Sequence, residues 1–167
     1  RTRDSIEVKQ YLSKLSPKQQ YKIILTPGKN GEYPLHHAAR KADLKMVQLL
    51  LSIIKANKPW SISWLRKEDT DQMANPGGFL PIHYAFSNPE LNIDEILNEF
   101  FLYGIPLDMT TSVIKEEKIF PSTQRNLFHV AAFCGHLSGI QFLIQLAHQQ
   151  PALLNTLLNA QDINGHT

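Results

Sequence analysis

The chain has 167 residues, 43% of them hydrophobic and 19% charged, which is the composition of an ordinary globular protein with one substantial core. Its 17 basic and 15 acidic residues leave a formal charge of +2, too balanced to predict a nucleic-acid footprint or a membrane-surface patch. One cysteine excludes an internal disulfide bond and favours a reducing, intracellular compartment.

Two short helices are predicted over residues 4–25. The apolar residues of the first recur at near-helical spacing: Ile6, Val8, Tyr11, Leu12 and Leu15. Ser16-Pro17 supplies an N-cap and a proline at the first helical position of the second, and Pro27-Gly28 ends it. The lysines and glutamines of this segment suit the polar outer side of a terminal repeat. We interpret it as an N-terminal cap, with a separate functional helical hairpin as the alternative.

A short motif, Pro34-Leu35-His36-His37-Ala38-Ala39, is then predicted to begin a helix, and two divergent copies of it follow. The copies are residues 81–86 and 127–132, and each is followed by a helical segment with paired large apolar residues. After the first copy, this second helix is predicted to run from about Leu44 to Lys55. The small side chains of Ala38 and Ala39 are predicted to be buried where neighbouring helices meet.

These units resemble the ankyrin repeat, whose pattern runs D-x-x-G-x-T-P-L-H-x-A-A-x-x-G-H-x-x-I-V-x-x-L-L, and the resemblance covers residues 28–167. It implies an all-α solenoid of helix pairs with β-hairpin fingers and an N-terminal helical cap. The implied units are the cap at 1–27, repeat 1 with a long insertion at 28–74, repeat 2 with an extended finger at 75–120, repeat 3 at 121–161 and the start of repeat 4 at 162–167. Because that last copy stops after its opening turn, we expect the chain to be a fragment of a longer protein.

The spacing departs from the family pattern. Pro34 to Pro81 spans 47 residues and Pro81 to Leu127 spans 46, against a family period of about 33. One insertion, at residues 57–65, contains Trp60 and Trp64; the other, at 109–123, has two β-prone runs around a polar turn and predicts an enlarged hairpin finger. A three-residue insertion around 87–90 lengthens the turn between the helices of repeat 2. Ala42-Asp43 stands where the family has Gly-His.

Three histidines, His36, His83 and His129, recur at one position of the repeat. The resemblance implies that each bonds to backbone in a neighbouring turn and sets the register of the stack. A metal site would need several ligands that converge on one point, whereas successive repeats lie about 10 Å apart. We therefore predict structural histidines.

No catalytic residue, cofactor or metal is predicted within these residues. Cys134 and His136 stand two apart at the end of a helix, where side chains point away from each other, and Gly135-His136 is already the turn of its repeat. The carboxylate pairs Glu68-Asp69 and Glu116-Glu117 lie in charged segments without apolar surroundings. The chain is accordingly not expected to be an enzyme by itself, to use a small-molecule substrate, to bind nucleic acid or to span a membrane.

A protein partner is therefore the expectation. In the family, the position after the repeated histidine and positions near the second small residue face a concave groove, which points to five residues: His37, Arg40, Tyr84, Val130 and Phe133. The enlarged finger adds seven: Val113, Ile114, Lys115, Glu116, Glu117, Ile119 and Phe120. Trp60 and Trp64 form a second candidate surface. Two alternatives stay open: Ile114 and Phe120 pack under the finger, and the tryptophans fold back on repeat 1.

Two functions follow from the resemblance. The first is a non-catalytic module that holds a partner protein in its groove and finger. The second is the targeting arm of a larger enzyme or effector whose catalytic domain lies elsewhere. The irregular repeats, in a chain rich in Asn, Lys, Gln and Ile, resemble ankyrin effectors of intracellular bacteria, which act in the host cytosol or nucleus; a divergent eukaryotic ankyrin protein is nearly as good a match.

Overall fold

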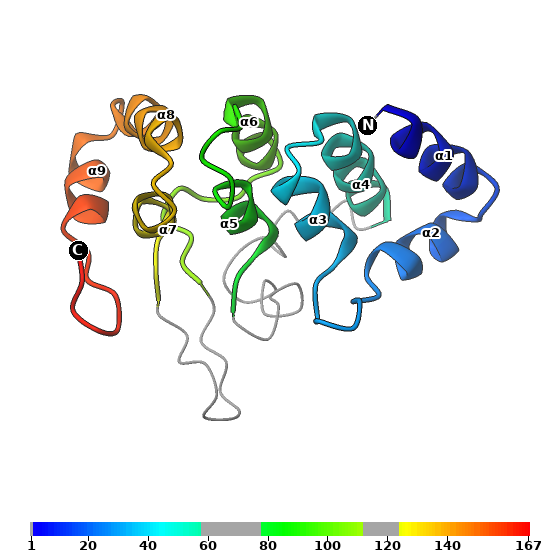
Figure 1. Ribbon diagram of the computed structural model, residues 1–167, viewed down its shortest axis with the longest axis horizontal. Coiled ribbons are helices and arrows are strands. Elements are labelled where there is room, and N and C mark those ends of the chain that lie inside the picture. The colour runs from blue at the N-terminus through cyan, green and yellow to red at the C-terminus, as the bar shows by residue number, and fades with distance from the viewer. Residues whose placement is uncertain (1, 58–77, 112–123) are drawn as a thin grey trace.

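The protein is described here by a computed structural model that covers residues 2–57, 78–111 and 124–167 (Figure 1). Within these ranges the chain is all-α, as predicted, and its extended backbone is limited to one antiparallel bridge between Thr110 and Asn126. None of the helices in the described ranges is long and apolar enough to cross a membrane.

The helices form pairs that stack side by side. Their bounds are α1 Thr2–Ser13, α2 Pro17–Ile24, α3 Pro34–Arg40, α4 Leu44–Asn57, α5 Pro81–Ala85, α6 Asp94–Leu102, α7 Leu127–Phe133, α8 Leu137–Ala147 and α9 Pro151–Leu158. Figure 1 shows α3, α5 and α7 in one row, which we call the inner helices, and α4, α6 and α8 in a second row, the outer helices. The pair α1 and α2 lies at one end of the stack and α9 at the other.

The N-terminal pair, α1 and α2, lies where two helices were predicted, and both pack against α4. Ser16 caps α2 by accepting a hydrogen bond from the backbone N–H of Gln19, whose side chain in turn accepts from the Ser16 N–H. The expected polar outer side is wrong in part, because four large apolar residues of this pair are exposed. They are Ile6, Val8, Tyr11 and Ile23.

Each full repeat begins its inner helix as the sequence predicts. Pro34 and Pro81 occupy the first turns of α3 and α5, where a missing N–H has no consequence for the helix. In repeat 1 the turn after the inner helix contains Ala42 at φ +49°, and in repeat 3 the matching position is Gly135 at φ +68°. This left-handed conformation favours glycine, so Ala42 is strained where the family pattern has glycine.

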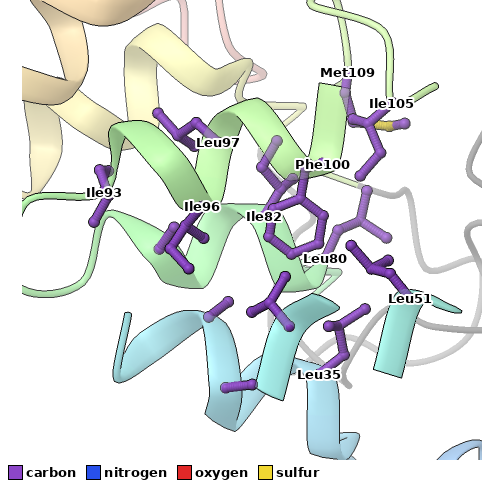
Figure 2. Close-up of a cluster of buried hydrophobic side chains, with 14 of the residues drawn as sticks. Leu35, Leu51, Leu80, Ile82, Ile93, Ile96, Leu97, Phe100, Ile105 and Met109 are labelled. Atoms are coloured by element: carbon purple, nitrogen blue, oxygen red, sulfur yellow. The ribbon is translucent and has the colours of Figure 1, made fainter. Parts of the chain in front are cut away.

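The core runs between successive helix pairs. Ala38 and Ala39 are buried, as predicted, and the neighbouring aliphatic and aromatic side chains fill the space between repeats 1 and 2 (Figure 2). The labelled members of this cluster are Leu35, Leu51, Leu80, Ile82, Ile93, Ile96, Leu97, Phe100, Ile105 and Met109. Burial of each such side chain stabilises the fold by roughly 1.5–3 kcal/mol relative to exposure, before entropy is counted.

The junction between repeats 2 and 3 differs from that between repeats 1 and 2. The backbones of α3 and α5 lie close along their lengths, and α4 approaches α6 similarly, whereas α7 and α8 stay further from α5 and α6. Phe86, fully buried, takes the inner-helix position that Ala39 takes in repeat 1. A ring in place of a methyl group holds the two helix pairs apart, so the stack is less tightly joined here.

The turn between α5 and α6 contains residues 86–93, which agrees with the predicted insertion in this repeat. Ser87 Oγ donates to the Tyr84 carbonyl oxygen and the Glu90 N–H donates to the Asn88 side chain, so the longer turn is internally bonded. It carries the chain from the short helix α5 to Ile93, which is fully buried at the start of α6.

Candidate interaction surface

Glu32, in the turn before α3, is the centre of a polar cluster that joins repeats 1 and 2. Its carboxylate accepts hydrogen bonds from Arg40 Nη2 at 2.6 Å and from the Tyr84 hydroxyl at 2.8 Å, and His37 Nε2 lies 3.3 Å away. The Arg40 guanidinium also lies over the Tyr84 ring, 4.5 Å from its centroid. The Glu32 side chain is 12% exposed, against 40% for Arg40 and 52% for His37. The carboxylate is thus covered, while Arg40 and His37 face solvent.

These contacts set the ionisation of the cluster. Burial alone would raise the pKa of Glu32, but the hydrogen bonds from Arg40 and Tyr84 outweigh it, and the pKa lies below its ordinary value. Burial and the hydrogen bond to Glu32 raise the pKa of Tyr84 to about 12. Glu32 therefore stays ionised and the Tyr84 hydroxyl stays a donor throughout the physiological range.

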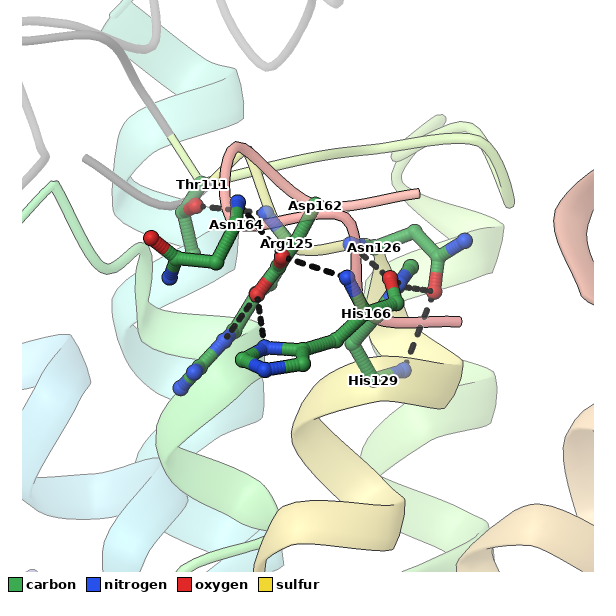
Figure 3. A network of polar contacts seen from close by, with 7 residues as sticks. All are labelled: Thr111, Arg125, Asn126, His129, Asp162, Asn164 and His166. Carbon is green, nitrogen blue, oxygen red and sulfur yellow. Dashed lines mark hydrogen bonds and ion pairs between the residues drawn. The ribbon is translucent and has the colours of Figure 1, made fainter. Parts of the chain in front are cut away.

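A second cluster of the same composition lies at the other end of the row (Figure 3). The buried carboxylate is Asp162, whose Oδ2 lies 3.3 Å from Arg125 Nε and 3.3 Å from His166 Nδ1. The Arg125 guanidinium lies over the Phe133 ring, 5.0 Å from its centroid. Although burial alone would raise the pKa of Asp162, backbone N–H donors from His166 and Asn164 and the side chains of Arg125 and His166 hold it well below its ordinary value.

Each cluster therefore combines a covered carboxylate from a turn, an arginine and an aromatic ring from an inner helix. Four of the five groove residues named from the sequence belong to them, namely His37, Arg40, Tyr84 and Phe133. Phe133 is the most exposed of them at 76%. We refer to these four residues together with Arg125 as the inner-helix face.

Val130 has to be removed from the candidate site. It occupies the same repeat position as His37 and Tyr84, but only 4% of its surface is exposed and it belongs to the core. A long polar side chain at this position extends to solvent, whereas a short apolar one stays against its apolar neighbours. The sequence pattern correctly predicted the repeat position of Val130 but not the direction of its side chain.

The remaining candidates lie outside the described residues. These are Trp60 and Trp64, and in the finger Val113, Ile114, Lys115, Glu116, Glu117, Ile119 and Phe120. The residues next to the finger do pair in antiparallel fashion: the Thr111 N–H donates to the Arg125 carbonyl oxygen at 2.9 Å, and the Arg125 N–H donates to Thr111 Oγ1 at 3.0 Å.

Sequence reasoning missed Glu32, Arg125 and Asp162. Glu32 and Arg125 share one repeat position, two residues before the first residue of the inner helix. A charged residue at this position, just before the recurring start of the inner helix, is the signal that could have identified both. Nothing local marked Asp162 as the ion partner of Arg125, because the two are 37 residues apart in the chain.

The repeated histidines act as predicted in two repeats. His36 Nδ1 accepts from the Tyr33 N–H and its Nε2 lies 3.0 Å from the Phe79 carbonyl oxygen of the next repeat. His129 likewise contacts the Asn126 N–H and the His166 carbonyl oxygen. His83 keeps only the local bond, from the Leu80 N–H, and its buried Nε2 has no hydrogen-bond partner among the described residues.

Cys134 and His136 have separate structural surroundings. His136 is fully buried and caps α8 by accepting a hydrogen bond from the Gly139 N–H, and its ring meets the edge of Phe86. Burial raises the pKa of the Cys134 thiol, which makes it a weaker nucleophile at neutral pH. Within the described ranges, His, Cys, Asp and Glu side chains form no group of three that could hold a metal ion.

Comparison with known proteins gives one family. The ankyrin-repeat family model matches residues 30–58, which span the turn after Gly28, α3 and α4. No curated protein matches the sequence. The match therefore covers repeat 1, and the same helix pair recurs along the stack.

Proposed function

Because residues 30–58 match the ankyrin-repeat family model, and such repeats generally mediate protein–protein interaction, we propose that the inner-helix face binds a partner protein without chemistry of its own. The observation that carries the proposal is the row of two arginine–aromatic pairs, Arg40 with Tyr84 and Arg125 with Phe133. Arginine and large aromatic side chains are the residue types that contribute most to protein interfaces.

The exposure of these residues supports the proposal further. A phenylalanine that is 76% exposed contributes nothing by burial to the stability of the isolated stack, and it becomes favourable when a partner covers it. The arginines beside the rings are held in place by covered carboxylates, so less side-chain entropy is lost when a partner binds.

The enlarged finger is a second part of this proposal and rests on the sequence alone. Val113, Ile114, Ile119 and Phe120 are apolar for a surface hairpin, and Lys115-Glu116-Glu117 forms its expected tip. The finger would follow directly from Thr111, which pairs with Arg125 at the end of the inner-helix face. A partner on that face would reach both.

The test is a pull-down with the wild-type chain followed by chemical cross-linking, which maps the contacted residues. Phe133→Ala should release the captured partner, whereas Leu102→Ala should retain it, because Leu102 is similarly exposed at 70% but lies on the outer helix α6. Replacing Lys115-Glu116-Glu117 by Asn-Gly shortens the tip and should weaken binding while the melting temperature is unchanged. Retention by both variants, with cross-links confined to the outer helices, would refute the proposal.

An alternative keeps the same surface in a different setting. The stack would be the targeting arm of a larger enzyme or effector, with catalysis outside these 167 residues. In that setting we propose an intracellular, reducing environment, or the host cytosol or nucleus if the protein is a bacterial effector. The two settings are distinguished by the sequence of the parent protein.

A further inference from the structure

We infer that the partner segment recognised by the inner-helix face is acidic: an extended stretch of a protein that carries Asp or Glu side chains next to an aromatic or large apolar residue. This inference rests on the proposed function and names the chemistry of the partner. It follows from which side chains of the two polar clusters are covered and which are exposed to solvent.

The carboxylates of this face are more covered than the arginines and imidazoles that contact them. The side chains of Glu32 and Asp162 are 12% and 0% exposed, whereas those of Arg40 and Arg125 are 40% and 20% exposed, and those of His37 and His166 are 52% and 69% exposed. Lys41, at the end of α3, is exposed as well. A ligand that approaches these residues therefore meets positive groups first, and the carboxylates act as supports behind them.

Two exposed carboxylates of the neighbouring described segments lie outside the inner helices in the chain. Glu90 lies in the turn between α5 and α6, and Asp108 follows α6. Neither belongs to α3, α5 or α7, so no described inner helix presents an acidic side chain to oppose an acidic ligand. The helices of this face thus have one sign of exposed charge.

The two arginines are prepared for a second carboxylate. Arg40 donates to Glu32 through Nη2 and also contacts Tyr84, and Arg125 faces Asp162 through Nε; a guanidinium has five N–H donors, so these contacts do not use all of them. The guanidinium carbons lie 4.5 Å and 5.0 Å from the ring centroids of Tyr84 and Phe133, and arginine is the cation suited to bidentate contact with a carboxylate. The exposed Phe133 ring offers an apolar surface beside Arg125, which is why the ligand should combine acidic and apolar residues.

Nucleic acid is the competing occupant, since phosphate also binds arginine and bases stack on aromatic rings. A nucleic-acid face requires a longer basic stripe than two arginines, and the whole chain carries a formal charge of only +2. An acidic peptide needs one or two such contacts together with apolar burial. The peptide is therefore favoured, and nucleic acid becomes an outcome of the test.

The test is selection of binders from a random peptide library displayed on phage, with the wild-type chain as bait. Selected peptides should be enriched in Asp and Glu beside aromatic or aliphatic residues, and synthetic copies should protect α3, α5 and α7 from hydrogen exchange. Peptides that protect these helices without an acidic excess would overturn the inference and leave the proposed function standing. Peptides that protect only the outer helices would overturn both, and tighter binding of a single-stranded DNA oligonucleotide than of any selected peptide would assign the face to nucleic acid.

Matched variants locate the charge effect. His37→Gln and Phe133→Ser change exposed side chains and should each weaken a selected peptide several-fold, and Arg40→Gln should weaken it about tenfold or more. Lys45→Gln removes the same charge from the exposed surface of the outer helix α4 and should leave the affinity unchanged. Thermal melting checks each variant for folding, and Arg40→Lys, which retains the charge beside Glu32, serves if Arg40→Gln does not fold. Equal loss of affinity in Lys45→Gln and Arg40→Gln would show a non-specific charge effect and overturn the inference.

Discussion

The ring of Phe86 packs directly against the backbone of Gly139 at the junction of repeats 2 and 3. A β-carbon at Gly139 would lie 2.8 Å from Phe86 Cε1 and 3.0 Å from His136 Nδ1. Gly139 is the third residue of α8, where the outer helices α4 and α6 have Met46 and Ile96. A larger residue in one repeat is thus matched by the loss of a side chain in the next.

This pairing predicts that the destabilising effect of Gly139→Ala depends on residue 86. In the wild type, overpacking against a fully buried ring costs about 1–3 kcal/mol and outweighs the gain of about 1 kcal/mol from replacing glycine within a helix. In a Phe86→Ala background only the 3.0 Å contact with His136 Nδ1 remains, so the same change should cost clearly less or be neutral. Urea unfolding of the four proteins of this cycle measures the coupling, and identical effects of Gly139→Ala in both backgrounds would contradict it.

Ala42 and Gly135 predict opposite effects from reciprocal substitutions. Ala42→Gly should stabilise the chain by roughly 0.5–1 kcal/mol, because relief of the left-handed strain exceeds the added entropy of the unfolded chain. Gly135→Ala should destabilise it by about 1 kcal/mol, although no atom lies within 4 Å of the added carbon. Thermal unfolding checks both, and a melting temperature that falls in Ala42→Gly would refute the conformational account.

The stability of the stack should fall between pH 6.5 and pH 4.5 because of its buried histidines. Burial lowers the pKa of His83 to about 3, whereas an unfolded histidine titrates near 6.5. Within this window the unfolded chain binds a proton that the folded chain excludes, so the free energy of unfolding decreases by about 1.4 kcal/mol for each pH unit and each such histidine. His36, whose pKa is also lowered by burial, adds to the slope.

Denaturant titrations across this range measure that slope. His83→Asn retains an acceptor for the Leu80 N–H but does not titrate. The free energy of unfolding of this variant should therefore change with pH by about 1.4 kcal/mol less per pH unit than that of the wild type, which corresponds to one proton. His148→Gln is the control, because His148 is exposed at the end of α8. The proposal fails if the slope of His83→Asn equals that of the wild type. Below pH 4.5, loss of charge on Glu32 and Asp162 begins to contribute as well, since their folded pKa values are depressed.

Tyr84→Phe should weaken the connection between repeats 1 and 2 while the ring stays over Arg40. It removes the hydrogen bond to the Glu32 carboxylate, which is worth about 1–2 kcal/mol for a charged acceptor in a half-covered position. The measurement is the free energy of unfolding, with the wild-type chain as reference. An unchanged value would show that Arg40 alone holds Glu32 in place.

The sequence predicted the helices well and the site only in outline. The inner helices begin where proline or asparagine precedes the recurring histidine, and their small residues are buried, because both features depend on local chemistry. The burial of the Val130 side chain follows from its being short and apolar, whereas the missing hydrogen-bond partner of His83 depends on how far apart successive repeats lie. That separation follows from one ring, Phe86, at a position where the repeat pattern has a small residue, and local patterns do not convey it.

The two polar clusters were hidden for a similar reason. Glu32 contacts Tyr84 across 52 residues and Arg125 contacts Asp162 across 37, so neither cluster forms a local motif. Only the turn-and-helix repetition brings their members together. The residues that the sequence did single out, His37, Arg40, Tyr84 and Phe133, are those that extend from the inner helices themselves.

The wider junction between repeats 2 and 3 determines how the stack would respond to mechanical load. Repeats 1 and 2 are joined by close helices, by the Glu32 bonds and by the His36–Phe79 hydrogen bond, all of which have to break together. Among the described residues, repeats 2 and 3 meet through apolar side chains, the ring contact of Phe86 with His136 and the short antiparallel pairing of Thr111 with Arg125. Two buried imidazole nitrogens there, on His83 and His136, have no partner among the described residues. Tension applied between the two ends of the chain would therefore separate repeat 3 first and leave the Arg40–Tyr84 pair intact.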